Sequence, residues 1–296
     1  MLDYALLAAL AAVVRTGSFE RAADQLNVTP SAVSQRIKLL EERIGAVLVV
    51  RGQPCTATVA GERLCQHVEQ VALLESSLRY NLPGLQPESH PVTLRIAVNA
   101  DSLATWFIPA MAQTEGFLFD LVVDDQDHSA EWLRRGEVVA AVTAHGKPIQ
   151  GCNSHFLGSL RYLATASPAF IDRWLREGLN GHSAARAPCL VFNRKDQLQA
   201  LWLRRVLGTD VTPPAHWLPS SQAFVDAALA GLGWGMNLEM MVQEHIRAGH
   251  LVTLEPSEPL EVPLFWQQSR IVGPLLGDLT RAVVETARTM LAPVTT

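Results

Sequence analysis

Residues 18–61 read SFERAADQLNVTPSAVSQRIKLLEERIGAVLVVRGQPCTATVAG, and they predict two short helices joined by a tight turn and followed by a hairpin. Ser18 can cap the first helix, because its hydroxyl can accept a hydrogen bond from a free backbone N–H of the first turn. Thr29 can cap the second helix in the same way, and Pro30 fits the first helical position, where its missing N–H is not needed. Gly45 is a typical residue at a helix end.

The second of these helices has an apolar face and a polar face. The apolar residues recur at spacings of 4, 3 and 4 and predict one buried stripe: Val33, Ile37, Leu40 and Ile44. The opposite face carries Ser31, Ser34, Gln35, Arg36 and Lys38. A first helix rich in alanine lets the second cross it closely and project its polar face into a DNA major groove. The alternative is an ordinary surface helix pair, since solvated faces carry the same residue types.

The exact residues of this stretch are more specific than its general helix-turn-helix pattern. A-A-x-x-L at 22–26, T-P-S-A-V-S-Q-R-I-K-x-L-E at 29–41, V-V-R at 49–51 and T-V-A-G at 58–61 resemble the N-terminal domain of LysR-type transcriptional regulators. In that family the second helix enters the major groove, and the hairpin after Gly45 is the wing of a winged helix-turn-helix. The wing departs from the family pattern at Val49 and Ala57, where Phe and Leu are common.

The resemblance implies a set of DNA-contacting residues. It assigns base reading to Ser34 and Gln35, and an amide such as that of Gln35 can pair bidentately with adenine. It assigns phosphate or base contact to Ser31, Arg36, Lys38, Arg51 and Thr58. Hydroxyls and cationic side chains are the usual partners of DNA phosphates, so the residue types agree with these roles.

Length and composition indicate how many domains the chain has and which partners suit it. A chain of 296 residues with 48% hydrophobic residues suits roughly two domains with sizeable cores. Its net charge of −5 is not that of a protein that coats nucleic acid. Residues 1–88 hold eight basic and nine acidic side chains, whereas residues 30–63 hold five basic and three acidic ones. DNA binding must therefore use one locally positive face.

The N-terminus and the cysteines indicate the compartment. The apolar stretch at 1–19 lacks a basic leading region and contains Asp3, so we expect the first domain helix there rather than a signal peptide. No segment reaches the ~20 uncharged apolar residues of a membrane span, which favours a cytoplasmic protein without a membrane partner. The four cysteines lack metal-ligand spacing, and we expect free thiols and no metal; a redox switch built on Cys152 and Cys189 is the alternative.

Residues 59–82 predict one amphipathic helix of roughly 24 residues, about 36 Å long. Its apolar stripe consists of Leu64, Val68, Val71, Leu74 and Leu78. One protomer has little to pack against over such a length, so we expect self-association, and in the family this helix pairs antiparallel with its twin. A dimer, or a tetramer built from it, would present recognition helices to two half-sites. The alternative is a long helix packed on its own domain.

Beyond a Pro-bounded hinge at 86–91, strands and helices alternate. We expect strands at 92–99, 119–125, 138–143, 161–166, 188–193 and 262–267, and helices at 101–113, 129–135, 168–177, 197–206, 222–230 and 274–291. Alternation implies α/β structure with largely parallel sheets. The family's effector domain has two Rossmann-like lobes, of the periplasmic-binding-protein type. The expected domains are 1–58 (winged helix-turn-helix), 59–90 (linker helix and hinge) and 91–296 (effector domain).

The ligand site is expected at strand ends in the effector domain. Ser102 lies where a helix follows a strand and is a candidate partner for a carboxylate. Asp124, Asp125 and Asp127 follow the next strand, at the sheet edge where open α/β sheets bind ligands. An anion site beside carboxylates suits a zwitterion with an extra positive charge. These residues could instead serve only as helix caps.

A second resemblance narrows the ligand. AVNADSLATW (97–106), the V-x-D-D/E run at 123–125, RRGEVVAAVT (134–143) and SSQAFV (220–225) resemble the arginine and lysine export regulators, the ArgP/LysG branch, also known as chromosome initiation inhibitors. That branch senses lysine or arginine and activates an exporter gene. We expect seven cleft residues: Ser102, Asp124, Asp125, Thr143, Asn193, Ser221 and Gln222. Asp124 or Asp125 would pair with the ligand's side-chain cation, and Ser102 with its α-carboxylate.

The sequence thus predicts a DNA-binding regulator that senses a basic amino acid, with RNA polymerase as a further candidate partner. No nucleophile elbow, H-E-x-x-H motif or phosphate loop is present, which argues against an enzyme and against a cofactor. The alternatives are a LysR-type regulator of another small carboxylate metabolite and a non-catalytic architectural DNA-binding protein.

Overall fold

The computed structural model describes residues 2–81, 91–124, 129–255 and 257–293, with the side chains of 79–81 excepted. The chain divides into two compact units, Met1–Ser89 and His90–Thr296. None of the described helices combines the length and the apolar character that crossing a membrane requires.

Unit 1 is a helical domain with a small hairpin. Its elements are α1 (Tyr4–Thr16), α2 (Phe19–Leu26), α3 (Pro30–Ile44), β1 (Val49–Val50), β2 (Thr56–Ala57) and α4 (Val59–Asn81). The caps expected from the sequence are confirmed: the Ser18 hydroxyl accepts from the Arg21 N–H, and the Thr29 hydroxyl accepts from the Ala32 N–H. β1 and β2 pair antiparallel, as the expected hairpin requires.

The core of unit 1 lies between α1, α2 and α3. Ala22 and Ala23 are buried there, and their small side chains let α2 lie close to its neighbours. Val33, Ile37 and Leu40 are buried as expected, but the prediction for Ile44 is wrong, since that residue is 39% exposed in the last turn of α3.

Two contacts hold the hairpin of unit 1 against its helices. The Glu41 carboxylate on α3 accepts the backbone N–H of Leu48 at 2.8 Å. Gly61 in the first turn of α4 faces the same residue, and a Cβ at this position would clash with the carbonyl oxygen of Leu48. The glycine of the T-V-A-G motif is therefore required by a close backbone approach.

The long helix α4 has 23 residues and a divided apolar stripe. Leu64 and Val68 pack against the core of unit 1. Leu74 and Leu78, further along, are 41% and 58% exposed. The first half of the helix therefore belongs to its own domain, and the second half leaves apolar side chains exposed.

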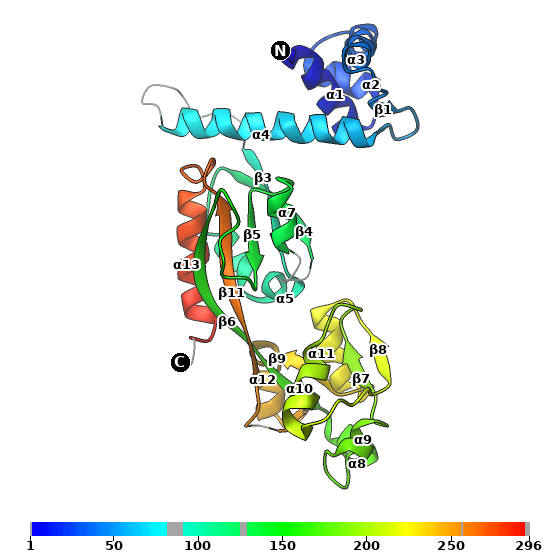
Figure 1. The fold of residues 1–296 in the computed structure, drawn as a ribbon, viewed down its shortest axis with the longest axis vertical. Helices are drawn as coiled ribbons and strands as arrows, with labels where there is room; N and C mark the ends of the chain where they lie inside the picture. Colours follow the sequence, from blue (N-terminus) through cyan, green and yellow to red (C-terminus); the bar gives the residue numbers. More distant parts are fainter. Residues whose placement is uncertain (1, 82–90, 125–128, 256, 294–296) are drawn as a thin grey trace. The chain divides into compact units, whose positions relative to one another are not determined.

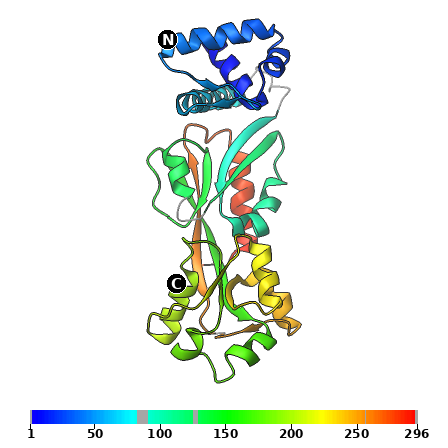
Figure 2. The ribbon, with the colours of Figure 1, turned by 90° about the vertical axis from the view of Figure 1, so that its right-hand side faces the viewer.

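Unit 2 has two lobes that share one sheet. Its elements are β3 (Val92–Val98), α5 (Ala100–Ser102), η1 (Leu103–Phe107, a π-helical turn), α6 (Ile108–Met111), β4 (Phe117–Val123), α7 (Ser129–Arg134), β5 (Ala140–Thr143), β6 (Cys152–Ala166), α8 (Pro168–Trp174), α9 (Gly181–Ala184), β7 (Cys189–Val191), α10 (Leu198–Leu207), β8 (Ala215–Trp217), α11 (Ser221–Leu229), β9 (Gly235–Leu238), α12 (Glu239–Arg247), β10 (Val252–Thr253), β11 (Leu260–Ser269) and α13 (Gly277–Met290). The first lobe contains β3–β5, α5–α7 and α13, and the second contains β7–β10 and α8–α12. Strands β6 and β11 run from one lobe to the other (Figure 1; Figure 2).

The seven-stranded sheet of unit 2 is mixed, so the expectation of largely parallel sheets is wrong there, whereas β7 and β8 form a separate parallel pair. The order of the mixed sheet is β10-β6-β11-β5-β3-β4, with β9 also paired to β6. β3 is parallel to β4 and β5, but the pairs β11–β5, β11–β6, β6–β9 and β6–β10 are antiparallel. The antiparallel pairs arise because β6 and β11 cross between the lobes in opposite directions.

The crossing strands are irregular where they leave the first lobe. Gly158 in β6 has a φ of 128°, and the register of β11 shifts between Leu264 and Phe265, opposite it. A Cβ at Gly158 would lie 2.8 Å from the Cβ of Leu291, so only glycine fits.

The helix after β3 begins earlier than expected. Asn99 is its N-cap residue, although the Asn99 side chain makes no cap hydrogen bond. Ser102, which could have been a cap, lies within α5 together with Asp101. The Asp101 side chain is therefore available for other contacts, and those contacts contribute to the site described below.

Candidate functional site

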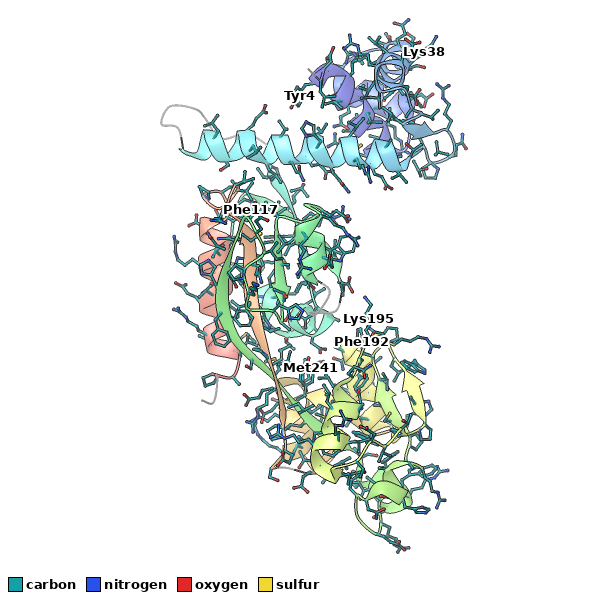
Figure 3. All side chains as sticks on the ribbon, in the orientation of Figure 1. Tyr4, Lys38, Phe117, Phe192, Lys195 and Met241 are labelled. Carbon is teal, nitrogen blue, oxygen red and sulfur yellow. The ribbon has the colours of Figure 1, made fainter. Side chains whose placement is uncertain are left out.

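The polar face of α3 is exposed as a DNA-reading face would require. Ser31, Gln35 and Lys38 are exposed, and Ser34 and Arg36 are half-buried. The hydroxyls of Ser31 and Thr29 are 3.0 Å apart. Figure 3 shows Lys38 on α3 at the outside of unit 1. The contacts of this face with DNA stay a prediction.

The two candidate DNA-contacting residues of the hairpin, Arg51 and Thr58, differ in the contacts that they already make within the protein. Arg51 is exposed, and its guanidinium lies 5.5 Å from the centroid of the Phe19 ring. The Thr58 hydroxyl donates to the carbonyl oxygen of Val47 at 2.8 Å and accepts from the N–H of Gly61 at 3.2 Å. Thr58 thus fixes the start of α4 within the protein, and a phosphate contact would have to compete with these bonds.

Unit 2 contains a cavity of about 300 Å³ between its lobes. Polar groups from both lobes line it: Asn99, Asp101, Asp124, Tyr162, Asn193, Lys195, Asp196, Ser221 and Asn237. Its apolar lining includes Phe192 and Met241, and Figure 3 shows these two with Lys195 on the side of the second lobe that faces the first. The cavity is large enough for a small metabolite.

The first carboxylate of the cavity, Asp101, is held by two hydroxyls. One oxygen accepts from the Tyr162 hydroxyl and the other from the Ser221 hydroxyl, each at 2.6 Å. Asp101 lies in α5, Tyr162 in β6 and Ser221 in α11. One carboxylate thus joins the first lobe, a crossing strand and the second lobe.

The second carboxylate, Asp124, is held by an indole and an ammonium. One oxygen accepts from the indole N–H of Trp132 at 3.0 Å. The other lies 3.2 Å from the Lys195 ammonium of the second lobe. The two carboxylates therefore both connect the lobes, Asp101 through the Ser221 hydroxyl and Asp124 through the Lys195 ammonium.

Two amide side chains of the cavity carry unused hydrogen-bonding groups. Asn99 is 2% exposed, and neither its amide nitrogen nor its amide oxygen has a hydrogen-bond partner among the described residues. Asn237 donates to the Thr165 hydroxyl at 3.0 Å, but its amide oxygen has no partner within the described part of the chain. Such groups are costly to bury alone, and a polar ligand would satisfy them.

Three of the residues expected in the cleft line this cavity: Asp124, Asn193 and Ser221. Asn193 has a local role as well, because its amide oxygen accepts the backbone N–H groups of Lys195 and Asp196 at 2.7 and 3.2 Å.

Three other expected cleft residues, Ser102, Thr143 and Gln222, do not line the cavity. Ser102 is fully buried, and its hydroxyl has no partner among the described residues. Thr143 is fully buried and accepts from the His145 N–H at 3.1 Å, while Gln222 is exposed and donates to Asp226. Asp125 and Asp127 lie outside the described residues.

Sequence reasoning missed Asn99, Asp101, Lys195 and Asn237. Asn99 and Asp101 lie within the AVNADSLATW segment, where the sequence analysis selected Ser102 as the ligand-binding residue. The role of Lys195 depends on Asp124, 71 positions away. No local sequence signal could have identified that pair.

The cysteines proposed for a redox switch are poor nucleophiles. Cys152 and Cys189 are free and buried. Burial raises the pKa of both thiols, to about 12 for Cys189. Since the thiolate is the reactive form, both side chains fit structural roles.

Comparison with known proteins gives full-length similarity. Residues 4–62 match the family described as bacterial regulatory helix-turn-helix protein, lysR family, and residues 88–288 match the LysR substrate binding domain. The HTH-type transcriptional regulator ArgP of Pseudomonas fluorescens is 45% identical over 296 residues, 99% of each chain. The crystal structure of ArgP from Mycobacterium tuberculosis is 43% identical and has a TM-score of 0.79, over 99% of this chain and 100% of that one.

A further solved structure carries a ligand. Full-length LysG from Corynebacterium glutamicum with bound effector Arg is 37% identical to this chain. The similarity covers 99% of this chain and 100% of that chain, with a TM-score of 0.67.

Proposed function

The chain belongs to the LysR family of bacterial transcriptional regulators, and from this membership we propose that it is a DNA-binding regulator whose ligand is lysine or arginine. Its target would be a promoter such as that of a basic amino acid exporter. The proposed domains are 1–58 for DNA binding, 59–90 for dimerisation and 91–296 for the ligand. Its relatives carry the names of regulators, and we propose no catalytic role.

The charge of the cavity is the observation that carries the ligand proposal. Among its described lining residues, Asp101, Asp124 and Asp196 bear carboxylates and Lys195 alone bears an ammonium. This net negative charge is complementary to lysine and arginine, which have two cationic groups and one carboxylate and so carry a net positive charge. The arginine effector of the related LysG agrees in chemistry with such a cavity.

The cavity can engage both ends of such a ligand. Asn99 and Asp101 are neighbours at the start of α5, and a free amide beside a carboxylate suits an α-carboxylate and an α-ammonium. Asp124 would bind the side-chain cation, as expected from the sequence. Asn99 replaces Ser102 as the candidate for the α-carboxylate, because Asn99 lines the cavity and Ser102 does not.

The proposed DNA contacts follow the polar face of α3. Ser34 and Gln35 would read bases, and Ser31, Arg36 and Lys38 would contact phosphates or bases, with Arg51 and Thr58 added from the hairpin. The near-neutral charge of residues 1–88 favours binding as a dimer or tetramer, since each motif alone attracts DNA weakly.

Calorimetry of the intact protein against the protein amino acids tests the ligand proposal. We expect heats of binding for lysine, arginine or both, and none for leucine or glutamate. A footprint on the promoter of a basic amino acid exporter, changed by the same ligand, tests the regulatory role. Heat from glutamate and none from arginine or lysine would contradict the proposal.

That contradictory result would support the second candidate, a regulator of another small carboxylate metabolite. The Lys195 ammonium is the observation that favours this candidate, because it is a cation available to an anionic ligand in the cavity.

A further inference from the structure

We infer that Lys195 is a specificity-determining residue, whose ammonium occupies the place on Asp124 that the ligand's side-chain cation would take. A ligand with a distal cation must then displace Lys195 to reach Asp124, whereas a neutral ligand need not. This inference rests on the proposed binding of lysine or arginine, and it adds a selection rule that the proposed function does not contain.

The Asp124 carboxylate contacts a cation of the second lobe. The indole N–H of Trp132 donates to one oxygen at 3.0 Å, and the Lys195 ammonium lies 3.2 Å from the other. The side chain of Asp124 is only 25% exposed. A second cation can therefore approach the occupied oxygen only by displacing Lys195 or by sharing the carboxylate with it.

The loop that carries Lys195 is held independently of this ion pair. Asn193 accepts the backbone N–H of Lys195, and the Asp196 carboxylate accepts the N–H groups of Phe192 and Leu198 at 2.9 and 3.0 Å. Asp196, the nearest carboxylate in sequence, is thus engaged with the backbone. The ammonium can leave Asp124 without disrupting the loop, since the loop is fixed by other bonds.

The exchange with Lys195 affects only ligands that carry a distal positive charge. The Lys195 side chain is 47% exposed, so its ammonium can return to water at low cost, as expected for a partly exposed ion pair. A guanidinium can bind a carboxylate through two parallel hydrogen bonds, whereas a single lysine ammonium binds as a point charge. A neutral side chain offers neither and leaves the Lys195–Asp124 pair in place.

The test compares arginine with citrulline, which has nearly the same shape but no side-chain charge. Calorimetry uses the intact protein and the variant Lys195→Met, which keeps the aliphatic stem. We expect arginine to bind the variant about two- to fivefold more tightly, the range for removing a partly exposed competing pair. Citrulline should change by less than about twofold, because it does not compete for Asp124.

Two further variants locate the effect. In an Asp124→Asn background, Lys195→Met should leave the arginine affinity unchanged, since the contested carboxylate is gone. Arg194→Met is the matched control: Arg194 is exposed, and its guanidinium lies 5.1 Å from the centroid of the Trp217 ring. This control removes one charge from the same loop and should not tighten arginine binding.

Several results overturn the inference. Weaker arginine binding by Lys195→Met would mean that Lys195 holds the ligand's carboxylate, and unchanged binding would mean that the pair is incidental. If Arg194→Met tightened arginine binding equally, the effect would come from the lower positive charge of the loop and not from the Lys195–Asp124 pair. Wild-type protein that binds neither arginine nor lysine would refute the proposed function itself, and the inference with it. Thermal unfolding checks that each variant is folded, and Lys195→Gln replaces Lys195→Met if it is not.

Discussion

The polar face of α3 and the cavity of unit 2 use polar side chains in opposite ways. On α3, Gln35 and Lys38 are exposed, so water already satisfies them. In the cavity, Asn99 is buried with an amide that has no partner among the described residues. Each single contact of the α3 face with DNA therefore adds little binding free energy, because it replaces a contact with water. The buried Asn99 amide is energetically costly without a partner, and a polar ligand that bonds to it removes that cost. DNA binding should therefore depend on the number of contacts, and ligand binding on a few groups.

The largest effect is expected from separating the protomers. Replacing Leu74 and Leu78 with Asp places charges on the exposed half of the α4 stripe, which we propose pairs with a second copy. Binding to a two-half-site promoter should weaken by about 10² to 10⁴, the usual range of an avidity gain. Analytical ultracentrifugation measures the assembly and fluorescence anisotropy the affinity. A dimer of unchanged stability would contradict the proposed role of α4.

The next largest effect is expected at Asp124. Asp124→Asn removes the charge that would bind the ligand's side-chain cation, and arginine affinity should fall by about 10- to 100-fold, as for a lost charge-assisted hydrogen bond. Promoter affinity without ligand should not change. Asp120→Asn is the control, because Asp120 pairs with Arg95 at 3.3 Å in the same lobe and outside the cavity. Calorimetry measures the arginine affinity of both variants. An equal loss of affinity in both would show that Asp124 does not bind the ligand's side-chain cation.

The next smaller effect is expected on the exposed face of α3, where a substitution should reduce base discrimination at one base pair. Gln35→Ala should reduce discrimination at a single position by about 1–3 kcal/mol, the value of one bidentate base contact. Lys38→Ala, in contrast, should weaken binding evenly across sequences and lower the salt dependence. Affinity measurements on a set of single-substitution promoters separate the two patterns. An even loss from Gln35→Ala would show that Gln35 contacts only the backbone of DNA.

The same two regions differ in how far their structure could be predicted from sequence. The helices of unit 1 are marked by local signals, because the Ser18 and Thr29 caps act on backbone groups three residues away. Ile44 fits the apolar stripe by spacing, yet it is exposed because the packing against α3 ends before its last turn. The spacing of apolar residues therefore predicts which face of a helix is buried, but not how many of its turns other elements pack against.

The cavity could be predicted only in part, because its contacts are distant in sequence. Asp101 is bonded to Tyr162 and Ser221, 61 and 120 positions away, and these separations leave no local pattern. The mixed sheet was missed for a similar reason, since strand alternation does not reveal that β6 and β11 run between the lobes. Asp124 was predicted correctly as a cavity-lining residue because a strand end is a local signal.

The smallest expected effect tests the unsatisfied amide directly. Asn99→Leu replaces that amide with an apolar group of similar shape, so the protein without ligand should become more stable by about 1 kcal/mol, measured by urea unfolding. Arginine binding should weaken at the same time, since the α-carboxylate loses its proposed partner. Asn237→Leu is the matched comparison: it breaks the bond to Thr165 and should destabilise the protein. If Asn99→Leu also destabilised the protein, the Asn99 amide would already be satisfied without a ligand, and the contrast between the cavity and the α3 face would not hold.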